Sequence, residues 1–255
     1  MIGLKGLVCL DMDRVLVDHL STWQVVYDKL GVSNEEAFNL YNSGKLNEWD
    51  WMKLDLQLIR DGVREKYDAE LTDTLLRSLV DDAPLMKGWF ELIQGCIDMG
   101  LKVAIISGGM QHTARKIAAS FPSLEGHRKR LGGIDYFTSR DYANGKDTLL
   151  HVFTNGWTSN HKRSGERGVE ITGRYQVEMN GKSSIVHLLS SRFKIGKDRI
   201  VSIGDSAGDI TMFQASSLAI CFNPYDEKPL QYADHVVKEK DLRIVLKLVE
   251  SYFSS

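Results

Sequence analysis

An apolar segment near the N-terminus ends in two aspartates that are separated by one residue. Gly6–Leu10 leads directly into Asp11-Met12-Asp13. The segment is apolar enough to be a strand that is buried on both faces. Carboxylates at the end of such a strand lose hydration, which is unfavourable. We therefore expect them there only where a cation compensates for the loss or where they serve a chemical function. The alternative is a strand that runs into an ordinary polar loop, and the rest of the sequence has to decide between the two.

The overall composition excludes several classes of protein. The net charge is −2, with 32 basic and 34 acidic residues, so nothing favours a nucleic-acid or anionic-membrane partner. No apolar run approaches the ~20 residues needed to span a bilayer. The first residues run straight into the first strand, which leaves no visible signal peptide. Three widely spaced cysteines are expected to be buried thiols in a reducing compartment. We therefore expect a cytoplasmic protein.

The order of the expected elements predicts an α/β fold. Beyond Pro84, helices alternate with strands, which predicts a Rossmann-like parallel sheet with right-handed crossovers. Residues 15–83 interrupt this pattern with helices only. We expect an all-helical cap over residues 15–83, inserted into a core formed by residues 1–14 and 84–255. The expected strands cover 101–107, 136–138, 199–203, 218–221 and 235–237, and the expected helices begin near the capping box Ser33-Asn34-Glu35-Glu36 and cover 46–59, 72–80, 89–99, 111–119, 183–193, 210–215 and 242–252.

Residues 139–181 fit the alternation poorly. They contain Asn144-Gly145, Asn155-Gly156 and Asn180-Gly181, which are typical of hairpin turns. We interpret this stretch as a β-hairpin excursion at the edge of the sheet. Within it, residues 158–168 are polar and basic, and we expect a mobile, solvated loop there rather than a binding arm.

Four segments carry groups suited to chemistry. The first is Asp11-Met12-Asp13, and the second is Ser107-Gly108-Gly109, which follows an apolar strand and offers a hydroxyl and free N–H groups to an anion. The third is Lys182, directly before a helix. The fourth ends another apolar strand with Gly204-Asp205 and Asp209, and a Gly-Asp-x-x-x-Asp pattern indicates an oxygen-ligated cation.

Together and in this order, the four segments resemble the haloacid dehalogenase-like phosphohydrolases. The cap position and the segments 84–88 and 204–209 are similar to the phosphoserine phosphatase-like branch, which has a helical cap. The resemblance implies that Asp11 is the nucleophile. It implies that Asp13 is the general acid and base. It assigns Mg²⁺ to Asp11, the Asp13 carbonyl, Asp205 and nearby Asp209, and the phosphoryl oxygens to Ser107, Gly108 and Lys182.

The sequence also departs from that branch. Val15 stands where a threonine is frequent. Leu20 occupies the place of the cap glutamate that grips an ammonium group, and Asp18 is the nearest acid. The cap arginine that grips a carboxylate has no clear match, and Arg60 and Arg64 are candidates only. Arg14 could reach a second anionic group or form a salt bridge to the cap. These departures predict that phosphoserine is not the best substrate and that an ester without an amino group reacts faster.

We therefore expect a Mg²⁺-dependent phosphomonoesterase that acts on a small phosphorylated metabolite. Three alternatives remain at this stage. They are phosphoserine phosphatase proper, a phosphotransferase with the same nucleophile, and a catalytically idle binding or regulatory protein on the same fold. The sequence leaves the oligomeric state open between monomer and homodimer.

Overall fold

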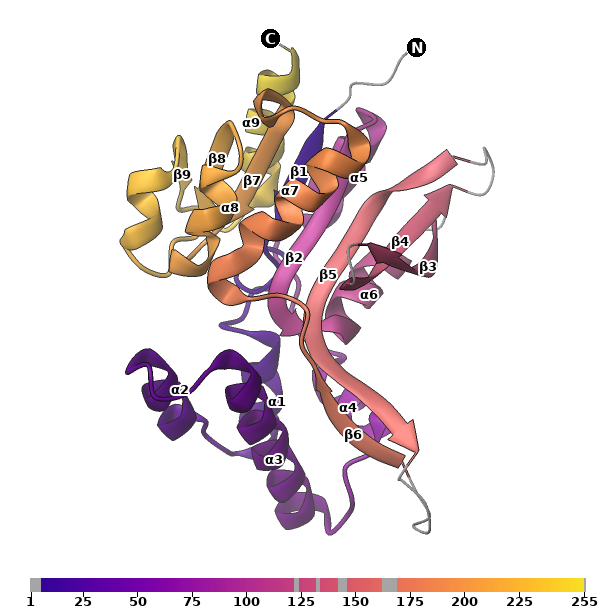
Figure 1. The fold of residues 1–255 in the computed structure, drawn as a ribbon, viewed down its shortest axis with the longest axis vertical. Coiled ribbons are helices and arrows are strands. Elements are labelled where there is room, and N and C mark those ends of the chain that lie inside the picture. The colour runs from indigo at the N-terminus through magenta and orange to yellow at the C-terminus, as the bar shows by residue number, and fades with distance from the viewer. Residues whose placement is uncertain (1–5, 122–123, 132–133, 142–145, 162–168, 255) are drawn as a thin grey trace.

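The computed structural model describes residues 6–121, 124–131, 134–141, 146–161 and 169–254. A layered α/β body lies in the upper part of Figure 1, and helices α1–α4 lie below it. The strands are β1 Leu7–Leu10, β2 Lys102–Met110, β3 Leu124–Leu131, β4 Ile134–Asp141, β5 Lys146–His161, β6 Val169–Arg174, β7 Ile200–Gly204, β8 Leu218–Phe222 and β9 His235–Val237. The helices are α1 Thr22–Leu30, α2 Glu35–Asn42, α3 Glu48–Tyr67, α4 Asp73–Val80, α5 Trp89–Asp98, α6 Gln111–Ala119, α7 Lys182–Phe193, α8 Ile210–Gln214 and α9 Leu242–Ser254.

Strand β1 lies in the middle of the sheet, between two parallel neighbours. The strand order is β3-β4-β5-β2-β1-β7-β8-β9, and β6 pairs with the far end of β5. Leu10 is in register with Ile105 of β2 and with Ile203 of β7. Because these strands run the same way, their carboxyl ends reach one edge of the sheet, where ligands bind in open α/β folds. The parallel α/β fold predicted from the sequence is confirmed for this part of the sheet.

Helices cover both faces of the sheet, and the alternating side chains of β1 show why. Val8 and Leu10 are fully buried in one apolar cluster with residues of α5, α6 and α9. Leu7 and Cys9 are fully buried in a second cluster with residues of α7 and α8. Successive strand residues point to opposite faces, so a strand that is apolar at every position suits a layer between two sets of helices. In Figure 1, α7 and α8 lie in front of the sheet and α5 and α9 behind it.

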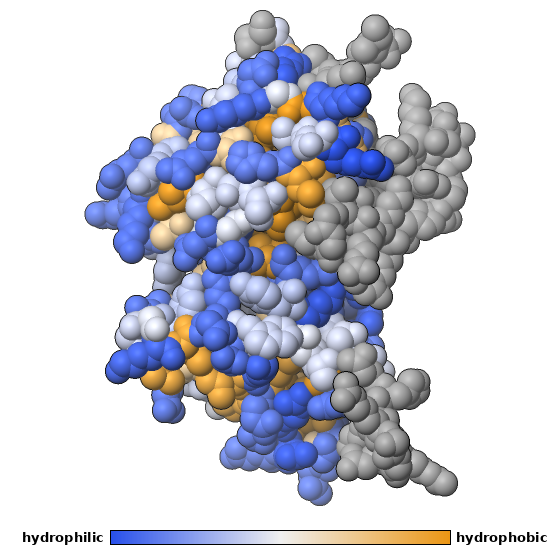
Figure 2. All heavy atoms as spheres, in the orientation of Figure 1, coloured by the Kyte–Doolittle hydropathy of each residue, from blue (hydrophilic) through white to orange (hydrophobic). Residues whose placement is uncertain are grey.

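Helices α1, α3 and α4 share a separate apolar cluster below the sheet, to which α2 contributes no buried residue. α1 and α4 begin with side-chain caps, in which Ser21 accepts from the Gln24 N–H at 2.9 Å and Thr72 accepts from the Leu75 N–H at 3.1 Å. The predicted capping box at residues 33–36 is wrong in detail, because Asn34 is the N-cap and makes no side-chain cap bond. Figure 2 shows apolar side chains on this face of the molecule over α2 and α3.

The hairpin of residues 139–181 differs from the prediction in its place. Strand β5 is not at the sheet edge, because it lies between β2, to which it runs parallel, and β4. Its far end pairs with β6 from Gly156 to His161. The two Asn-Gly turns predicted at 155 and 180 are wrong, since Gly156 lies inside β5 and Gly181 lies in a 3₁₀ helix, Met179–Gly181. The predicted turn at 144–145 and most of the loop 158–168 lie outside the described residues.

Tertiary packing decided several boundaries that local patterns did not show. α1 was not predicted as a separate helix, and α3 runs eight residues past its predicted end at Ile59. β3 and β4 pair antiparallel, so the sheet is parallel only from β5 to β9. The division into a core and a cap over residues 15–83 stays a proposal, and the apolar cluster of α1, α3 and α4 also includes Trp157 and Ile171 from the β5–β6 hairpin. Among the described helices, none has the length and apolarity to cross a membrane.

Candidate active site

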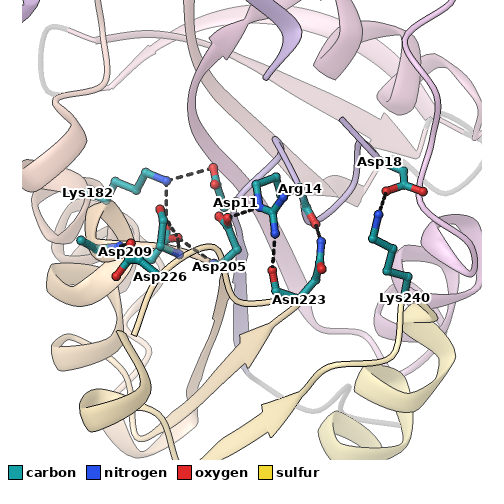
Figure 3. Close-up of polar contacts among 11 residues, drawn as sticks. Asp11, Arg14, Asp18, Lys182, Asp205, Asp209, Asn223, Asp226 and Lys240 are labelled. Atoms are coloured by element: carbon teal, nitrogen blue, oxygen red, sulfur yellow. Dashed lines mark hydrogen bonds and ion pairs between the residues drawn. The ribbon is translucent and has the colours of Figure 1, made fainter. Parts of the chain in front are cut away.

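Four acidic or basic groups from distant parts of the sequence meet where the central strands end. Asp11 follows β1 and its N–H donates to the Ile203 carbonyl at 2.9 Å, which extends the sheet pairing by one residue. Asp205 follows β7, Asp209 lies one turn further on, and Lys182 begins α7. Figure 3 shows these four side chains directed toward one another. The parallel register thus gathers residues that the sequence separates by more than 190 positions.

Lys182 is the buried cation of this group. Its Nζ lies 2.9 Å from Asp11 Oδ1 and 2.7 Å from Asp209 Oδ1. The residue is only 4% exposed. Burial lowers the pKa of Lys182, but the carboxylates of Asp11 and Asp209 outweigh that effect and hold the pKa above its usual value. Lys182 therefore keeps its positive charge at neutral pH beside Asp11.

Asp209 is a positioning residue for the loop after β7. Its Oδ2 accepts from the N–H groups of Asp205 at 2.9 Å and Ser206 at 3.2 Å, while its Oδ1 accepts from Lys182. A Cβ on Gly204 would lie 2.3 Å from the Asp209 Cγ, so only glycine allows this close approach. Both oxygens of Asp209 are engaged, which leaves Asp11 and Asp205 with the freer carboxylates.

Arg14 contacts the core rather than the cap. Its Nε donates to Asp205 Oδ2 at 2.8 Å, and its NH2 group donates to the Asn223 carbonyl at 2.9 Å. The guanidinium also lies over the Tyr225 ring, 5.2 Å from its centroid. The salt bridge to the cap that the sequence left open for Arg14 is therefore wrong. Arg14 adopts a left-handed backbone conformation, with φ of 61°.

The three aspartates are suited to a metal ion. One carboxylate oxygen from each of Asp11, Asp205 and Asp209 lies within 4.8 Å of the others, and all three residues are buried. Burial, with the negative charge of Asp209, raises the pKa of the Asp11 and Asp205 carboxyls above their usual range. Crowded buried carboxylates repel one another, and a divalent cation with oxygen ligands relieves that repulsion. The donor set is all oxygen, as Mg²⁺ prefers.

Asp13 lies beside the cluster with a different environment. Its Oδ1 accepts from the Thr22 N–H at 3.0 Å, at the start of α1. Burial raises the pKa of Asp13 to about 7, and the negative charge of Asp11 adds to the effect. A carboxyl with a pKa near neutrality can both donate and accept a proton. A Cβ on Gly109 would lie 2.5 Å from Asp13 Oδ2, so the glycine gives this carboxyl its space.

Ser107, Gly108 and Gly109 close another side of the site. They form the irregular end of β2, and α6 begins at Gln111 as predicted. Ser107 Oγ accepts from the Gly109 N–H at 3.1 Å. The Gly108 carbonyl accepts from Trp23 Nε1 at 3.1 Å. Ser107 is 1% exposed and lines the cavity.

A single cavity of about 630 Å³ contains all seven predicted site residues except Asp209 in its lining. Val15 does not line it and is fully buried in the core cluster. Leu20 does line it and is 47% exposed. The cavity extends from the strand ends to helices α1–α3. Its floor carries the aspartates and Lys182, and its wall carries the aromatic rings of Trp23, Phe38 and Trp51. The volume suits a small molecule.

Three of the predicted candidates do not line the cavity. Asp18 pairs with Lys240 at 2.6 Å, away from the aspartate cluster in Figure 3. Arg64 pairs with Glu70 at 3.1 Å. Arg60 donates to the Ile171 carbonyl of β6. The structure therefore gives no support to a role of these residues in gripping substrate.

Several residues that line the cavity were missed in the sequence. Asn155 holds the β5–α7 connection, with its Oδ1 accepting from the Val177 N–H at 2.8 Å. Glu48 and Asp55 of α3 also line the cavity. Asp55 had a detectable signal, because it interrupts the apolar stripe of Met52 and Ile59 on one face of the helix. The sequence signal at Asn155 was misleading, because an asparagine that precedes a glycine usually indicates a hairpin turn.

Comparisons with known proteins agree with this geometry. The model of the haloacid dehalogenase-like hydrolase family matches residues 152–247. The phosphoserine phosphatase of Methanocaldococcus jannaschii is 26% identical, with 96% of this chain and 98% of the relative covered. The phosphoserine phosphatase of Campylobacter jejuni subsp. doylei is 25% identical, with 94% of this chain and 97% of the relative covered.

Solved structures show the same fold along nearly the whole chain. A phosphoserine phosphatase structure described as a phospho-aspartyl intermediate analogue superposes with a TM-score of 0.66 at 22% identity, and covers 96% of this chain and 99% of its own. A substrate-bound phosphoserine phosphatase complex gives a TM-score of 0.66 at 21% identity, with 96% and 98% covered. With the four motifs in one site and relatives that match along nearly the whole chain, the chain is similar to the haloacid dehalogenase-like hydrolases and, among them, to the phosphoserine phosphatases.

Proposed function

We propose that the protein is a Mg²⁺-dependent phosphomonoesterase that hydrolyses a small phosphorylated metabolite in the cytoplasm, through an aspartyl-phosphate intermediate on Asp11. One observation carries this proposal. Lys182 lies 2.9 Å from Asp11 in a buried cluster of three aspartates, at the floor of a cavity of about 630 Å³. Lys182, together with a Mg²⁺ ion bound by the aspartates, can hold a dianionic phosphoryl group against a carboxylate nucleophile, which would otherwise repel it.

Asp11 and Asp13 divide the chemistry in this proposal. An oxygen of Asp11 attacks phosphorus, the bond from phosphorus to the ester oxygen breaks, and Asp13 donates its proton to that oxygen as it leaves. Asp13 then accepts a proton from the water that cleaves the phosphoryl group from Asp11. The pKa of about 7 that burial gives Asp13 suits both steps. The Thr22 N–H fixes one oxygen of Asp13 and leaves the other for the proton transfer.

The phosphoryl oxygens are assigned to three groups. These are the Ser107 hydroxyl, the Gly108 N–H and the Lys182 ammonium, all of which line the cavity. They oppose the charge that the oxygens carry in the transition state. Asp11, the Asp13 carbonyl and Asp205 would hold Mg²⁺, which neutralises charge and orients the phosphate when bound. Asp209 takes part by holding Lys182 and the Asp205 loop in place.

Release of inorganic phosphate from 4-nitrophenyl phosphate tests this function. We expect turnover with Mg²⁺ and none with EDTA, and recovery when Mg²⁺ is added back. Incubation with substrate followed by acid quench and mass spectrometry should find a phosphoryl group on the peptide that contains Asp11. Labelled phosphate that passes only to an acceptor alcohol, with none released to water, would identify a phosphotransferase instead. No phosphate release from any ester would favour a binding protein on this fold.

A further inference from the structure

The cap wall of the cavity carries negative and aromatic groups but no basic side chain. The described cap residues in the lining include the acids Glu35, Glu48 and Asp55, and no lysine or arginine. The basic groups of the lining are Arg14, Lys182 and Lys228, which come from residues outside α1–α4. The part of a substrate that extends beyond its phosphate group therefore faces acids and rings.

Asp55 is the buried acid of this wall. It lies on α3, is 6% exposed, and forms no ion pair with any residue in the described part of the chain. Its neighbours are neutral, and Asn34 Nδ2 donates to its Oδ1 at 3.4 Å. Burial raises the pKa of Asp55 to about 6, and the nearby polar groups of Tyr27, Asn34 and Trp51 offset only part of that rise. A carboxylate in this situation lacks the cation that buried charges normally pair with.

Aromatic rings surround the same part of the cavity. Tyr27, Phe38, Trp51 and Tyr175 line it. Trp51 is held in place by Tyr41, which stacks on it with ring centroids 4.6 Å apart, and by Phe38 at 5.9 Å. The faces of such rings attract cations, most strongly where water is excluded. Rings and a buried carboxylate together favour one kind of ligand group, a positively charged amine.

Glu48 adds negative charge but is fully engaged. Its Oε2 accepts from the Tyr175 hydroxyl at 2.9 Å and from the Met179 N–H at 3.0 Å, and its Oε1 accepts from the Tyr41 hydroxyl at 3.1 Å. These bonds join the first turn of α3 to the segment before Lys182. A substrate carboxylate in this part of the cavity would meet Glu48 and Asp55 with no basic partner, and burying it there would be costly.

We propose that the cap end of the cavity is a binding site for a cationic amine, with Asp55 as its carboxylate, so that the substrate is the phosphate monoester of an amino alcohol without a carboxylate group. This proposal rests on the phosphomonoesterase function proposed above. It replaces the sequence-based expectation of an amine-free substrate, which considered only Leu20 and Asp18. A carboxylate reaches the cavity from α3 instead.

The test compares esters that differ in one group. We expect kcat/KM for phosphoethanolamine to exceed that for propyl phosphate, its neutral counterpart of similar size, by about tenfold or more. Phosphoserine, which adds a carboxylate, should fall below phosphoethanolamine by a similar factor. Phosphocholine distinguishes the two parts of the site, because a quaternary amine uses the rings but donates no hydrogen bond to Asp55.

Variants then assign the preference to Asp55. Asp55→Asn should lower the ratio of kcat/KM for phosphoethanolamine to that for propyl phosphate by about tenfold. Glu65→Gln is the matched control, because Glu65 is an exposed acid on the same helix and does not line the cavity. It should leave the ratio unchanged. Trp51→Leu removes a ring from the wall and should also lower the ratio, which keeps the test decisive if Asp55→Asn does not fold.

Each outcome has a separate meaning. A ratio of one or less in the wild type overturns the amine site, and so does an unchanged ratio in both Asp55→Asn and Trp51→Leu. Faster hydrolysis of phosphoserine than of phosphoethanolamine overturns the exclusion of a carboxylate. Failure to release phosphate from any of these esters and from 4-nitrophenyl phosphate contradicts the proposed enzyme function instead.

Discussion

The two ends of the cavity are built in opposite ways. At the strand ends, Asp11, Asp205 and Asp209 surround Lys182, and each side chain has a charged partner or a network of hydrogen bonds. At the cap end, Asp55 is buried among neutral and aromatic groups. The strand end therefore holds several paired charges whose positions are fixed by the sheet. The cap end holds few charges, and its buried carboxylate, Asp55, has no cationic partner among the described residues.

This difference suggests a division of labour. Groups fixed by parallel strands keep their geometry, which chemistry on a phosphoryl group requires. Helix α1 contacts the floor directly, since the Thr22 N–H donates to Asp13 and Trp23 Nε1 donates to the Gly108 carbonyl. Asp55 of α3 lines the cavity wall and, within the described part of the chain, has no such contact with the floor. Substitutions at the strand ends should therefore change turnover, and substitutions on the α3 wall should change preference or stability.

The largest expected effect is at Asp11. Asp11→Asn keeps the size of the side chain but removes the nucleophile, so we expect kcat to fall by at least ~10³-fold with the fold retained. Steady-state phosphate release and circular dichroism on the same sample measure both. A folded Asp11→Asn protein with turnover near that of the wild type would contradict the nucleophile assignment.

The next effect is at the metal site. Asp205→Ala removes a carboxylate that lies within reach of Asp11 and Asp209, so Mg²⁺ affinity and activity should fall together, by ~100-fold or more. Titration calorimetry with Mg²⁺ and kinetics over a range of Mg²⁺ concentrations give the two quantities. Ca²⁺ should restore little activity to the EDTA-treated wild type, because its coordination is larger and looser. Full activity in EDTA would exclude this mechanism.

A third prediction concerns stability and tests the unbalanced charge of Asp55. Its pKa is raised from 3.8 to about 6 in the folded protein, so the folded state binds the proton more tightly than the unfolded chain. Stability should therefore be lost as pH rises from about 4 to 6 and then stay level. Asp55→Asn removes this penalty and should raise the free energy of unfolding at pH 7.5 by about 1–3 kcal/mol.

Urea unfolding of both proteins measures this difference. The increase in the free energy of unfolding caused by Asp55→Asn should fall to about half of its pH 7.5 value at pH 5.0, because the wild-type Asp55 is then mostly protonated in the folded state. Glu65→Gln again serves as the control and should show little change at either pH. An Asp55→Asn protein that is less stable than the wild type at pH 7.5 would show that the carboxylate has a stabilising partner.

The smallest expected effect is at Arg64. This arginine pairs with Glu70 on the surface and does not line the cavity. Arg64→Gln should change KM for phosphoserine and for phosphoethanolamine by less than about twofold, and stability by less than about 1 kcal/mol. A tenfold rise in KM for phosphoserine alone would show that Arg64 reaches the substrate when the cap moves.

The same contrast explains what the sequence could predict. The fold of the core and the meeting of Asp11 and Asp205 followed from strands that end in polar residues, because parallel strands deliver their ends to one edge. Lys182 ends no strand and was assigned to the site only through the family resemblance. The cap wall did not follow, since whether Glu48 or Asp55 faces a cavity depends on how helices pack. Asn155 was misread because Asn-Gly usually marks a turn, whereas here Gly156 lets β5 continue with φ of 136°.

Strand β5 has a consequence for how such a protein can be rebuilt. It pairs with the central sheet at one end, and at the other it places Trp157 in the apolar cluster of the cap helices. Gln111 binds it at the crossing, with the Trp157 N–H donating to Gln111 Oε1 at 3.0 Å. The proposed cap is therefore not an insert that can be exchanged on its own. A chimera that exchanges residues 15–83 alone would pair foreign helices with a resident hairpin, so a functional transplant has to carry residues 156–175 with it.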